Sequence, residues 1–164
     1  MAARLCFATF YLRDIFFGVP VEDVQEVLQF HEVTPVPLAC AFLPGVINLR
    51  GQILTAMDLK MRLGLTEEAF SGGGMHVVIR CNDGLVSLLV DKIGEVLEID
   101  GELCEIPPKT LKPGVHEVTT LVCKLEEKLL LILDTGKLMQ STGNKALGNG
   151  ADLLQTPVDA ASFN

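Results

Sequence analysis

Histidine and cysteine are the residues of this chain best suited to bind a metal or to act as nucleophiles. The sequence has three histidines and five cysteines: His31, His76, His116, Cys6, Cys40, Cys81, Cys104 and Cys123. No two histidines stand four positions apart, and no two cysteines have the C-x-x-C spacing, so the usual zinc-binding patterns are missing. Because His76 begins an apolar segment, we interpret it as a residue at the start of a strand. We expect no metal site.

The cysteines are odd in number and widely scattered, which does not suit a framework of paired disulfides in a secreted protein. We therefore expect reduced and mostly buried cysteines in a cytoplasmic protein. A cysteine nucleophile and its histidine need only be close in space, so a Cys-dependent enzyme stays open as an alternative.

Other catalytic patterns find little support in the sequence. The chain has four serines and no G-x-S-x-G motif, and the run Ser71–Gly74 is not followed by the Lys-Ser or Lys-Thr pair of a phosphate-binding loop. A glycosidase would need two carboxylates across a cleft, and one Tyr with no Trp offers such a cleft few walls. We expect neither catalytic residues nor a cofactor.

Composition and charge exclude several classes of partner. Hydrophobic residues make up 49% of the 164 residues but aromatic residues only 5%, so the core is aliphatic and favours strands. The net charge of −8 argues against nucleic-acid binding and against docking on anionic lipid. No apolar run reaches the length of about 18 residues that a membrane span needs. Arg13 and Asp14 interrupt the N-terminal apolar run, which we interpret as a strand and not as a signal peptide.

Short apolar runs between turn signals predict a mainly β fold. We expect ten strands, at 5–11, 15–19, 26–31, 46–49, 52–57, 76–81, 85–90, 95–99, 118–124 and 128–133. The sequence Asn82-Asp83-Gly84 predicts a tight hairpin. Ten strands are too many for one small sheet, and two small barrels would leave fewer exposed strand edges.

Three short helices are expected between the strands. Pro20 precedes a first helix at 21–24, and Asp58 and Asp134 are candidate N-caps of helices at 58–63 and 134–140. The glycine-rich residues 66–75 have the composition of a flexible connector. We expect one domain at residues 1–141 and a disordered C-terminal tail at 142–164, because the tail has few apolar residues.

Two segments rise above this background. In the first, residues 45–52, the sequence Asn48-Leu49-Arg50-Gly51 interrupts two short apolar strands, and its glycine permits a bend or a close backbone approach. The second is Val24-Gln25-Glu26, where the short helix passes into a strand that Glu26 begins.

These segments carry a resemblance to a known family. Thr34-Pro35-Val36-Pro37, followed by 45–51 and Asp58-Leu59, is similar to the signature of the CheW family. The similarity continues upstream at 7, 15–19 and 24–26 and downstream at 77–79, 90–97 and 130–138, so it covers about residues 3–140 in the right order. The glycine-rich connector and the tail are not signatures of the family, and 102–116 matches only loosely.

The resemblance implies a fold and a function. The fold would be two five-stranded SH3-like β-barrel lobes side by side, with a few short helices. Members are non-enzymatic adaptors of bacterial chemotaxis, which couple the cytoplasmic tips of methyl-accepting chemoreceptors to the regulatory domain of the histidine kinase CheA. This places the chain in the cytoplasm, at membrane-associated receptor arrays, with no membrane insertion. The receptor-contact positions that match are Val24, Glu26, Gly45, Asn48, Arg50 and Gly51; the kinase-contact residues are not assigned.

The opposite charges of Glu26 and Arg50 predict an ion pair between neighbouring strand ends, since a planar guanidinium binds a carboxylate through two parallel hydrogen bonds. A peptide-binding β-barrel module of another cytosolic pathway is the alternative function, followed by the Cys-dependent enzyme.

Overall fold

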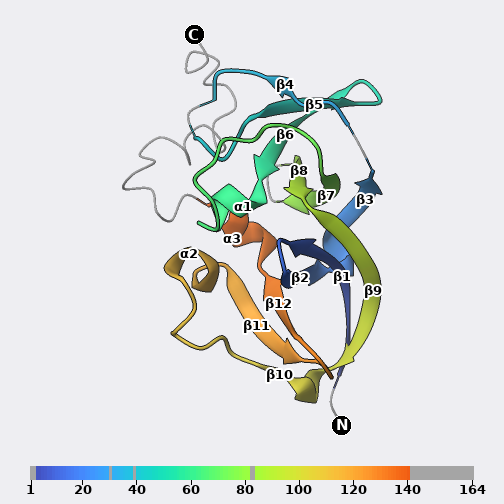
Figure 1. Cartoon of the computed structure of the whole chain (residues 1–164). Coiled ribbons are helices and arrows are strands. Elements are labelled where there is room, and N and C mark those ends of the chain that lie inside the picture. Colours follow the sequence, from blue (N-terminus) through green and yellow to red (C-terminus); the bar gives the residue numbers. More distant parts are fainter. Residues whose placement is uncertain (1–2, 30, 39, 82–83, 141–164) are drawn as a thin grey trace.

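The computed structural model describes residues 3–29, 31–38, 40–81 and 84–140. It folds them into two lobes, each built on one six-stranded sheet (Figure 1). The predicted tail, 142–164, and the first two residues of the predicted Asn82-Asp83-Gly84 hairpin lie outside the described residues. None of the described helices is long and apolar enough to cross a membrane.

The terminal lobe is formed by strands from both ends of the chain, in the order β10-β11-β12-β2-β1-β9. These strands are β1 (Arg4–Leu12), β2 (Ile15–Pro20), β9 (Lys92–Asp100), β10 (Cys104–Glu105), β11 (Thr119–Lys124) and β12 (Leu129–Leu133). The parallel pair β12–β2 joins the N-terminal and C-terminal parts of the chain.

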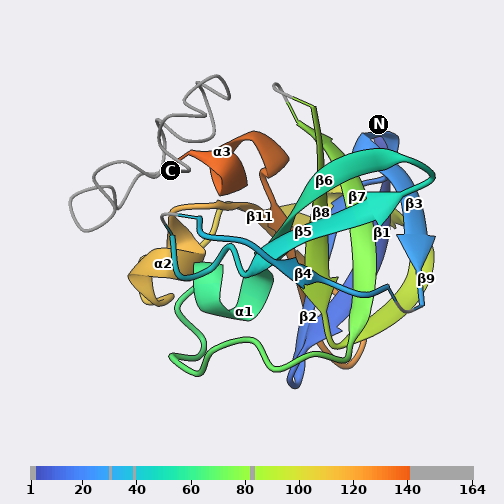
Figure 2. The ribbon, with the colours of Figure 1, turned by 90° about the horizontal axis from the view of Figure 1, so that it is seen from above.

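The central lobe has the strand order β3-β7-β8-β6-β5-β4. Its strands are β3 (Val24–Leu28), β4 (Thr34–Pro35), β5 (Gly45–Leu49), β6 (Gln52–Asp58), β7 (Met75–Cys81) and β8 (Gly84–Val90). It too contains one parallel pair, β6–β8. Seen from above, the β5–β6 hairpin reaches the side of the lobe where β3 lies (Figure 2).

The two β lobes confirm the expected fold class, but each sheet has six strands and not five. The additional strands are β4 and β10, which contain two residues each. Strands this short have no alternation of apolar and polar residues, so no sequence pattern indicates them.

The helices are short and lie at the junctions between strands. They are the 3₁₀ helices η1 (Val21–Asp23) and η2 (Gly101–Leu103) and the α-helices α1 (Leu59–Arg62), α2 (Pro113–His116) and α3 (Thr135–Met139). Asp58 and Asp134 cap α1 and α3 as predicted, since their carboxylates accept hydrogen bonds from the N–H groups of Met61 and Lys137. The helix α2 was not predicted.

The largest apolar core lies between the lobes and not inside either one. Its buried members include Phe10, Phe17 and Leu133 of the terminal lobe and Met57 and Leu88 of the central lobe. Smaller cores fill each lobe, around Phe7, Phe16, Ile99, Cys123, Leu130 and Ile132 in the terminal lobe and around Ile47, Leu49, Leu54, Ala56, Val78 and Leu89 in the central lobe. Because most of the apolar surface is shared, the lobes stabilise each other.

A buried arginine adds a polar link between the lobes. Arg62 of α1 is 9% exposed. Its Nε donates to the carbonyl oxygen of Leu138 at 2.8 Å, and its Nη2 donates to those of Lys137 and Gln140 at 3.0 and 2.9 Å. Arg62 thereby donates to carbonyl groups at the C-terminal end of α3, where a helix leaves its last carbonyls without partners of its own; that of Lys137 also accepts from the N–H of Gln140.

The expectation that all cysteines are reduced is wrong for one pair. Cys104 of β10 and Cys123 of β11 are joined by a disulfide bond. The two residues are opposite each other in the antiparallel pair β10–β11, and β10 was not predicted. Cys6, Cys40 and Cys81 take no part in a disulfide bond.

Candidate partner-binding site

The Asn-Leu-Arg-Gly segment forms the tight turn between β5 and β6. Leu49 pairs with Gln52 across it, and the two residues of the turn, Arg50 and Gly51, have φ angles of +52° and +86°. Two consecutive positive φ angles define the type I′ turn that suits the twist of a hairpin. Gly51 adopts this conformation freely, but for Arg50 it costs about 1 kcal/mol. Arg50 therefore occupies a backbone position that local preference does not favour.

The turn is held by hydrogen bonds on both sides. The Asn48 side-chain oxygen accepts a hydrogen bond of 2.9 Å from the Gly51 N–H. The Nε2 atom of His31 lies 2.7 Å from the carbonyl oxygen of Asn48, and it must be the donor because a carbonyl only accepts. His31 belongs to the segment that follows β3, so this bond fastens the turn to the opposite side of the lobe.

The predicted ion pair between Arg50 and Glu26 is confirmed. Nη1 and Nη2 of Arg50 donate to the two carboxylate oxygens of Glu26 at 2.8 and 2.5 Å. The hydrogen bond from Arg50, reinforced by its charge, lowers the pKa of Glu26, and the same contact raises the pKa of Arg50. The Arg50 side chain is 69% exposed and that of Glu26 22%, so the guanidinium stays open to solvent while its orientation is fixed.

A β-bulge in β3 directs the Glu26 side chain. The register between β3 and β7 shifts between Val24 and Glu26, so that Val24 pairs with Ile79 and Glu26 with Val78. A bulge inserts one residue and turns the following side chain. The inserted residue, Gln25, accepts a hydrogen bond of 2.5 Å from Arg80, which fastens the bulge to β7.

Beneath the turn lies a buried polar network that the sequence did not indicate. His76 and Ser87 are 1% and 0% exposed. The Nε2 atom of His76 lies 3.1 Å from the carbonyl oxygen of His31, and its Nδ1 lies 2.9 Å from the Ser87 hydroxyl. Nε2 therefore donates and Nδ1 accepts from Ser87. Burial lowers the pKa of His76, so its ring is neutral around pH 7. His76 was expected at a strand start and lies in β7, but its role in supporting His31 is new.

The structure brings four of the six predicted site residues together: Glu26, Asn48, Arg50 and Gly51. Gly45 lies at the opposite end of β5. Because an extended strand rises about 3.3 Å per residue, Gly45 is about 16 Å from the turn. It is buried, and a side chain there would collide with the carbonyl oxygen of Thr34. Val24 packs against the core between the lobes. Gly45 is thus required for the close approach of β4, and Val24 for the packing of the lobes.

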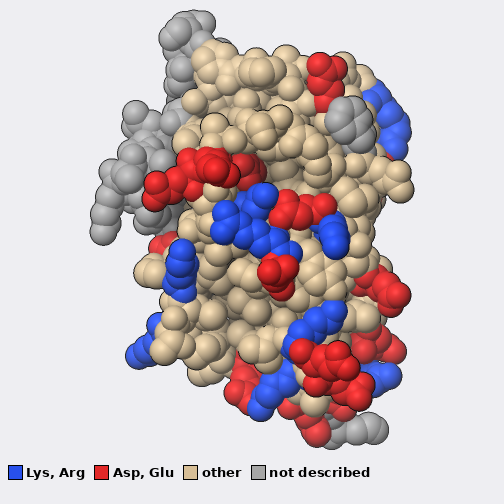
Figure 3. Space-filling model, viewed as in Figure 1, with Lys and Arg blue, Asp and Glu red and all other residues tan. Residues whose placement is uncertain are grey.

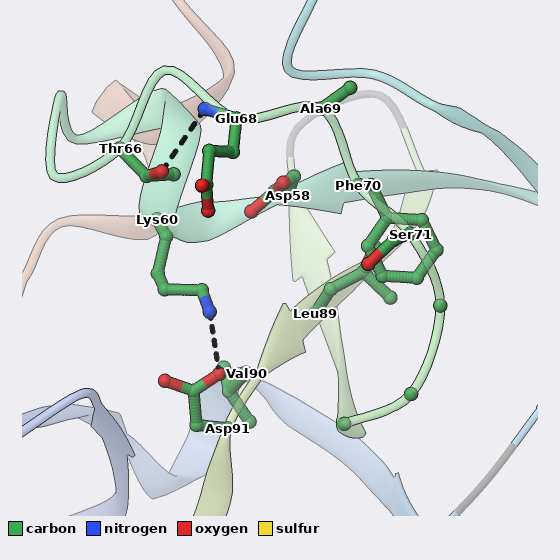
Figure 4. Close-up of a pocket in the computed structure, with 13 residues that line it drawn as sticks. Asp58, Lys60, Thr66, Glu68, Ala69, Phe70, Ser71, Leu89, Val90 and Asp91 are labelled. Carbon is green, nitrogen blue, oxygen red and sulfur yellow. Dashed lines mark hydrogen bonds and ion pairs between the residues drawn. The ribbon is translucent and has the colours of Figure 1, made fainter.

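A small polar pocket of about 120 Å³ lies between α1, the glycine-rich connector and the end of β8 (Figure 4). Lys60 points from α1 to Asp91 and forms an ion pair of 2.9 Å with it. Burial raises the pKa of Asp58, and the N–H of Met61 counteracts this by bonding to the carboxylate. These charges already have structural partners, and no His or Cys is among the residues that line the pocket.

The described residues give little support to cysteine or metal chemistry. Burial raises the pKa of the Cys40 thiol, which is opposite to what a nucleophilic thiolate needs. His31 and His76 bond to backbone and hydroxyl oxygens. Within the described part of the chain, no group of three His, Cys, Asp or Glu side chains is placed to hold a metal ion.

Comparison with known proteins identifies the family. The model of the CheW-like domain matches residues 7–143. The chain is 28% identical to the chemotaxis protein CheW of Treponema pallidum over 145 residues, which is 86% of this chain and 85% of that protein. It is 27% identical to CheW of Klebsiella aerogenes over 135 residues, 82% of this chain and 81% of that protein.

A solved structure agrees with this assignment. The crystal structure of the scaffolding protein CheW from Thermoanaerobacter tengcongensis superposes with a TM-score of 0.75 at 27% identity, covering 86% of this chain and 96% of that one. The family model and the superposed structure point to the same family, and the chain belongs to the CheW-like domain family.

Proposed function

We propose that this chain is a non-enzymatic adaptor that couples chemoreceptors to the histidine kinase CheA in bacterial chemotaxis. Its receptor-binding residues are Val24, Glu26, Gly45, Asn48, Arg50 and Gly51. Among them, Glu26, Asn48, Arg50 and Gly51 form the contact surface, while Gly45 and Val24 maintain the strands that carry it. The kinase is bound through its regulatory domain.

The observation that carries this proposal is the conformation of Arg50. A non-glycine residue with positive φ persists only where its surroundings hold it, and such positions cluster at functional sites. Here Glu26 and Asn48 hold the turn, and the guanidinium remains 69% exposed. An arginine that is exposed to solvent and held in one orientation is suited to bind another protein.

The location follows from the function. The chain acts in the cytoplasm, at receptor arrays next to the membrane, without inserting into it. Each contact with a receptor or kinase is modest in area, and the strength of the assembly comes from many such contacts at once. The net charge of −8 agrees with protein partners and disfavours nucleic acid.

The test is the charge reversal Arg50→Glu. We expect it to abolish binding to a purified cytoplasmic-tip fragment of a receptor from the same cell, while binding to the CheA regulatory domain and the thermal midpoint stay close to wild type. Arg4→Glu is the matched control, because Arg4 is an exposed arginine paired with Glu98 in the terminal lobe. Equal loss of receptor and kinase binding with a lower midpoint would make Arg50 a structural residue and would contradict the proposal.

The double reversal Arg50→Glu with Glu26→Arg separates orientation from contact. If the ion pair served only to fix the turn, the reversed pair would restore receptor binding. We expect no restoration, because the guanidinium itself meets the receptor. Binding of an unrelated peptide by wild type, with no receptor binding, would instead indicate a peptide-binding module of another pathway.

The ion pair also sets a pH limit. Because the pKa of Glu26 is lowered in the folded protein, the pair is complete above its unfolded value and is lost as the pH falls through the lowered pKa. Around neutral pH Glu26 therefore stays ionised, and we expect protonation of Glu26 to have no effect on receptor binding there.

A further inference from the structure

The terminal lobe contains a cleft that is lined by none of the six proposed receptor-binding residues. It has a volume of about 620 Å³ and lies between β1, β2, β9 and the turn from β11 to β12. Its size is within the range of ligand-binding pockets. The Arg50 turn is in the central lobe, so the two surfaces belong to different lobes of the molecule.

The floor of the cleft is aromatic and already holds a cation. The rings of Tyr11 and Phe16 stack with their centroids 4.7 Å apart. The Lys128 ammonium lies 4.2 Å from the Phe16 centroid and 5.1 Å from the Tyr11 centroid, and it bonds to the Tyr11 hydroxyl at 2.6 Å. Lys128 is an exposed side chain on a turn, so it can leave the rings at little cost.

The rim of the cleft is acidic. The residues that line it include four carboxylates, Glu95, Glu98, Glu126 and Glu127, and one ammonium, Lys128, while Arg4 pairs with Glu98 from outside the lining. Figure 3 shows acidic side chains gathered over β9 and the start of β12, with basic ones between them. Negative charge around a low-dielectric hollow attracts and orients cations.

Apolar side chains next to the rings complete the lining of the cleft. Leu97, Ile99 and Leu125 line it and belong to the apolar cluster of the terminal lobe that also contains Phe16. A ligand for this site therefore needs a positive charge and apolar neighbours.

We propose that this cleft binds a positively charged segment of a partner protein. An arginine or lysine of that segment replaces Lys128 over the rings of Tyr11 and Phe16, and the neighbouring aliphatic side chains pack on Leu97 and Leu125. Arginine is preferred, because a guanidinium stacks on aromatic rings and is more weakly hydrated than an ammonium.

The test uses two synthetic peptides, acetyl-Arg-Leu-Arg-Leu-Arg-amide and its counterpart with Glu in place of Arg. Titration is followed by ¹H–¹⁵N NMR on the full chain, so neither receptor nor kinase is needed and the result is independent of the proposed receptor contact. We expect the basic peptide to shift the signals of 94–99 and 125–128, weakly and with salt sensitivity, and the acidic peptide to shift none of them.

Three variants locate the binding. Lys128→Ala removes the competing ammonium and should tighten peptide binding by about two- to fivefold. Glu126→Lys with Glu127→Lys should weaken it on the order of tenfold. Glu67→Lys with Glu68→Lys, the same change at the other Glu-Glu pair of the chain, should have no such effect.

Two results would overturn the inference. One is shifts spread over the whole surface, or equal shifts with both peptides, which would mean nonspecific attraction to an acidic protein. The other is concentration-dependent self-association in sedimentation that Glu126→Lys with Glu127→Lys abolishes, which would make a second copy of this chain the occupant.

Discussion

The two lobes share an architecture but differ in how their interiors are completed. Each has six strands with one parallel pair that brings distant parts of the chain together. The terminal lobe is filled by apolar residues that include Phe7 and Phe16, and its β10 edge is tied by the Cys104–Cys123 disulfide. The central lobe is filled by smaller aliphatic residues, and it buries the polar pair His76–Ser87.

This difference shows how one fold supports two kinds of surface. A buried polar group must be hydrogen-bonded, and a network of such bonds fixes one arrangement of the backbone. In the central lobe the network runs from Ser87 through His76 and His31 to Asn48, and so fixes the turn that carries Arg50. The surface of the terminal lobe is different, because its cleft is lined by the aromatic rings of Tyr11 and Phe16.

The largest effect is expected where the two lobes meet. Arg62→Ala removes the buried donor to the carbonyl oxygens of Lys137, Leu138 and Gln140, of which that of Lys137 keeps a second donor, the N–H of Gln140, at a cost of about 3 kcal/mol or more. Arg62→Met keeps the aliphatic volume and tests the hydrogen bonds alone. Urea unfolding followed by circular dichroism measures both, with one transition expected for wild type because the main core is shared. Two separate transitions would mean that the lobes are independent.

The disulfide, which ties the β10 edge of the terminal lobe, should have the next largest effect. It closes a loop over a sequence separation of 19 residues, which corresponds to about 3 kcal/mol of stability relative to the reduced chain. Non-reduced protein should show three reactive thiols after unfolding and five after reduction, and reduction should lower the thermal midpoint. Cys6→Ser is the control, since Cys6 is a free thiol. Five thiols in the non-reduced protein would refute the bond.

His76 provides the corresponding test in the central lobe. His76→Ala leaves Ser87 and the carbonyl oxygen of His31 unpaired and should lower the free energy of unfolding by about 2 kcal/mol. Burial lowers the pKa of His76 below 6.5. The unfolded chain therefore binds a proton first as the pH falls, and stability decreases from about pH 6.5 downward through the lowered pKa. His76→Gln should flatten that decrease in urea titrations between pH 5 and 8; an unchanged slope would mean that other groups cause it.

The sequence predicts the long strands of both lobes well, and the short strands and helices that connect them poorly. Strands with clear apolar runs, such as β2 and β6, were predicted within one residue at each end. The strand predicted at 95–99 is longer in the structure, where β9 covers Lys92–Asp100. Its first residues were missed because the apolar side chains of β9 change from one core to another along the strand: Ile93 packs on the core between the lobes and Leu97 on the core of the terminal lobe.

The candidate site was only partly predictable for a similar reason. The Arg50–Glu26 pair follows from charge and from the motif, whereas the positive φ of Arg50 depends on contacts with distant residues. His31 was predicted at the end of the strand 26–31, but β3 ends at Leu28, and nothing in the sequence connects the irregular segment that follows to Asn48. The same holds for Cys104, because its own strand, β10, contains only two residues and has no apolar pattern that would indicate it. Long-range contacts at short elements are where sequence patterns carry least information.

The smallest effect is expected from the C-terminal residues beyond both lobes. Arg62 bonds to carbonyl oxygens as far as Gln140, and the buried core ends at Leu138. Residues 143–164 contain few apolar side chains, so they have little surface to bury in either lobe. Removing 143–164 should leave the thermal midpoint within about 1 °C of the full chain in calorimetry, since a change of 1 kcal/mol would shift it by several degrees.

Replacing Leu153 and Leu154 by Ser in the full chain is the matched variant, because these are the adjacent leucines of the segment. A drop of many degrees in both variants would show that this segment packs on a lobe through Leu153 and Leu154, and a drop in the truncation alone would assign the effect to its other residues, among them Leu147, Val158 and Phe163.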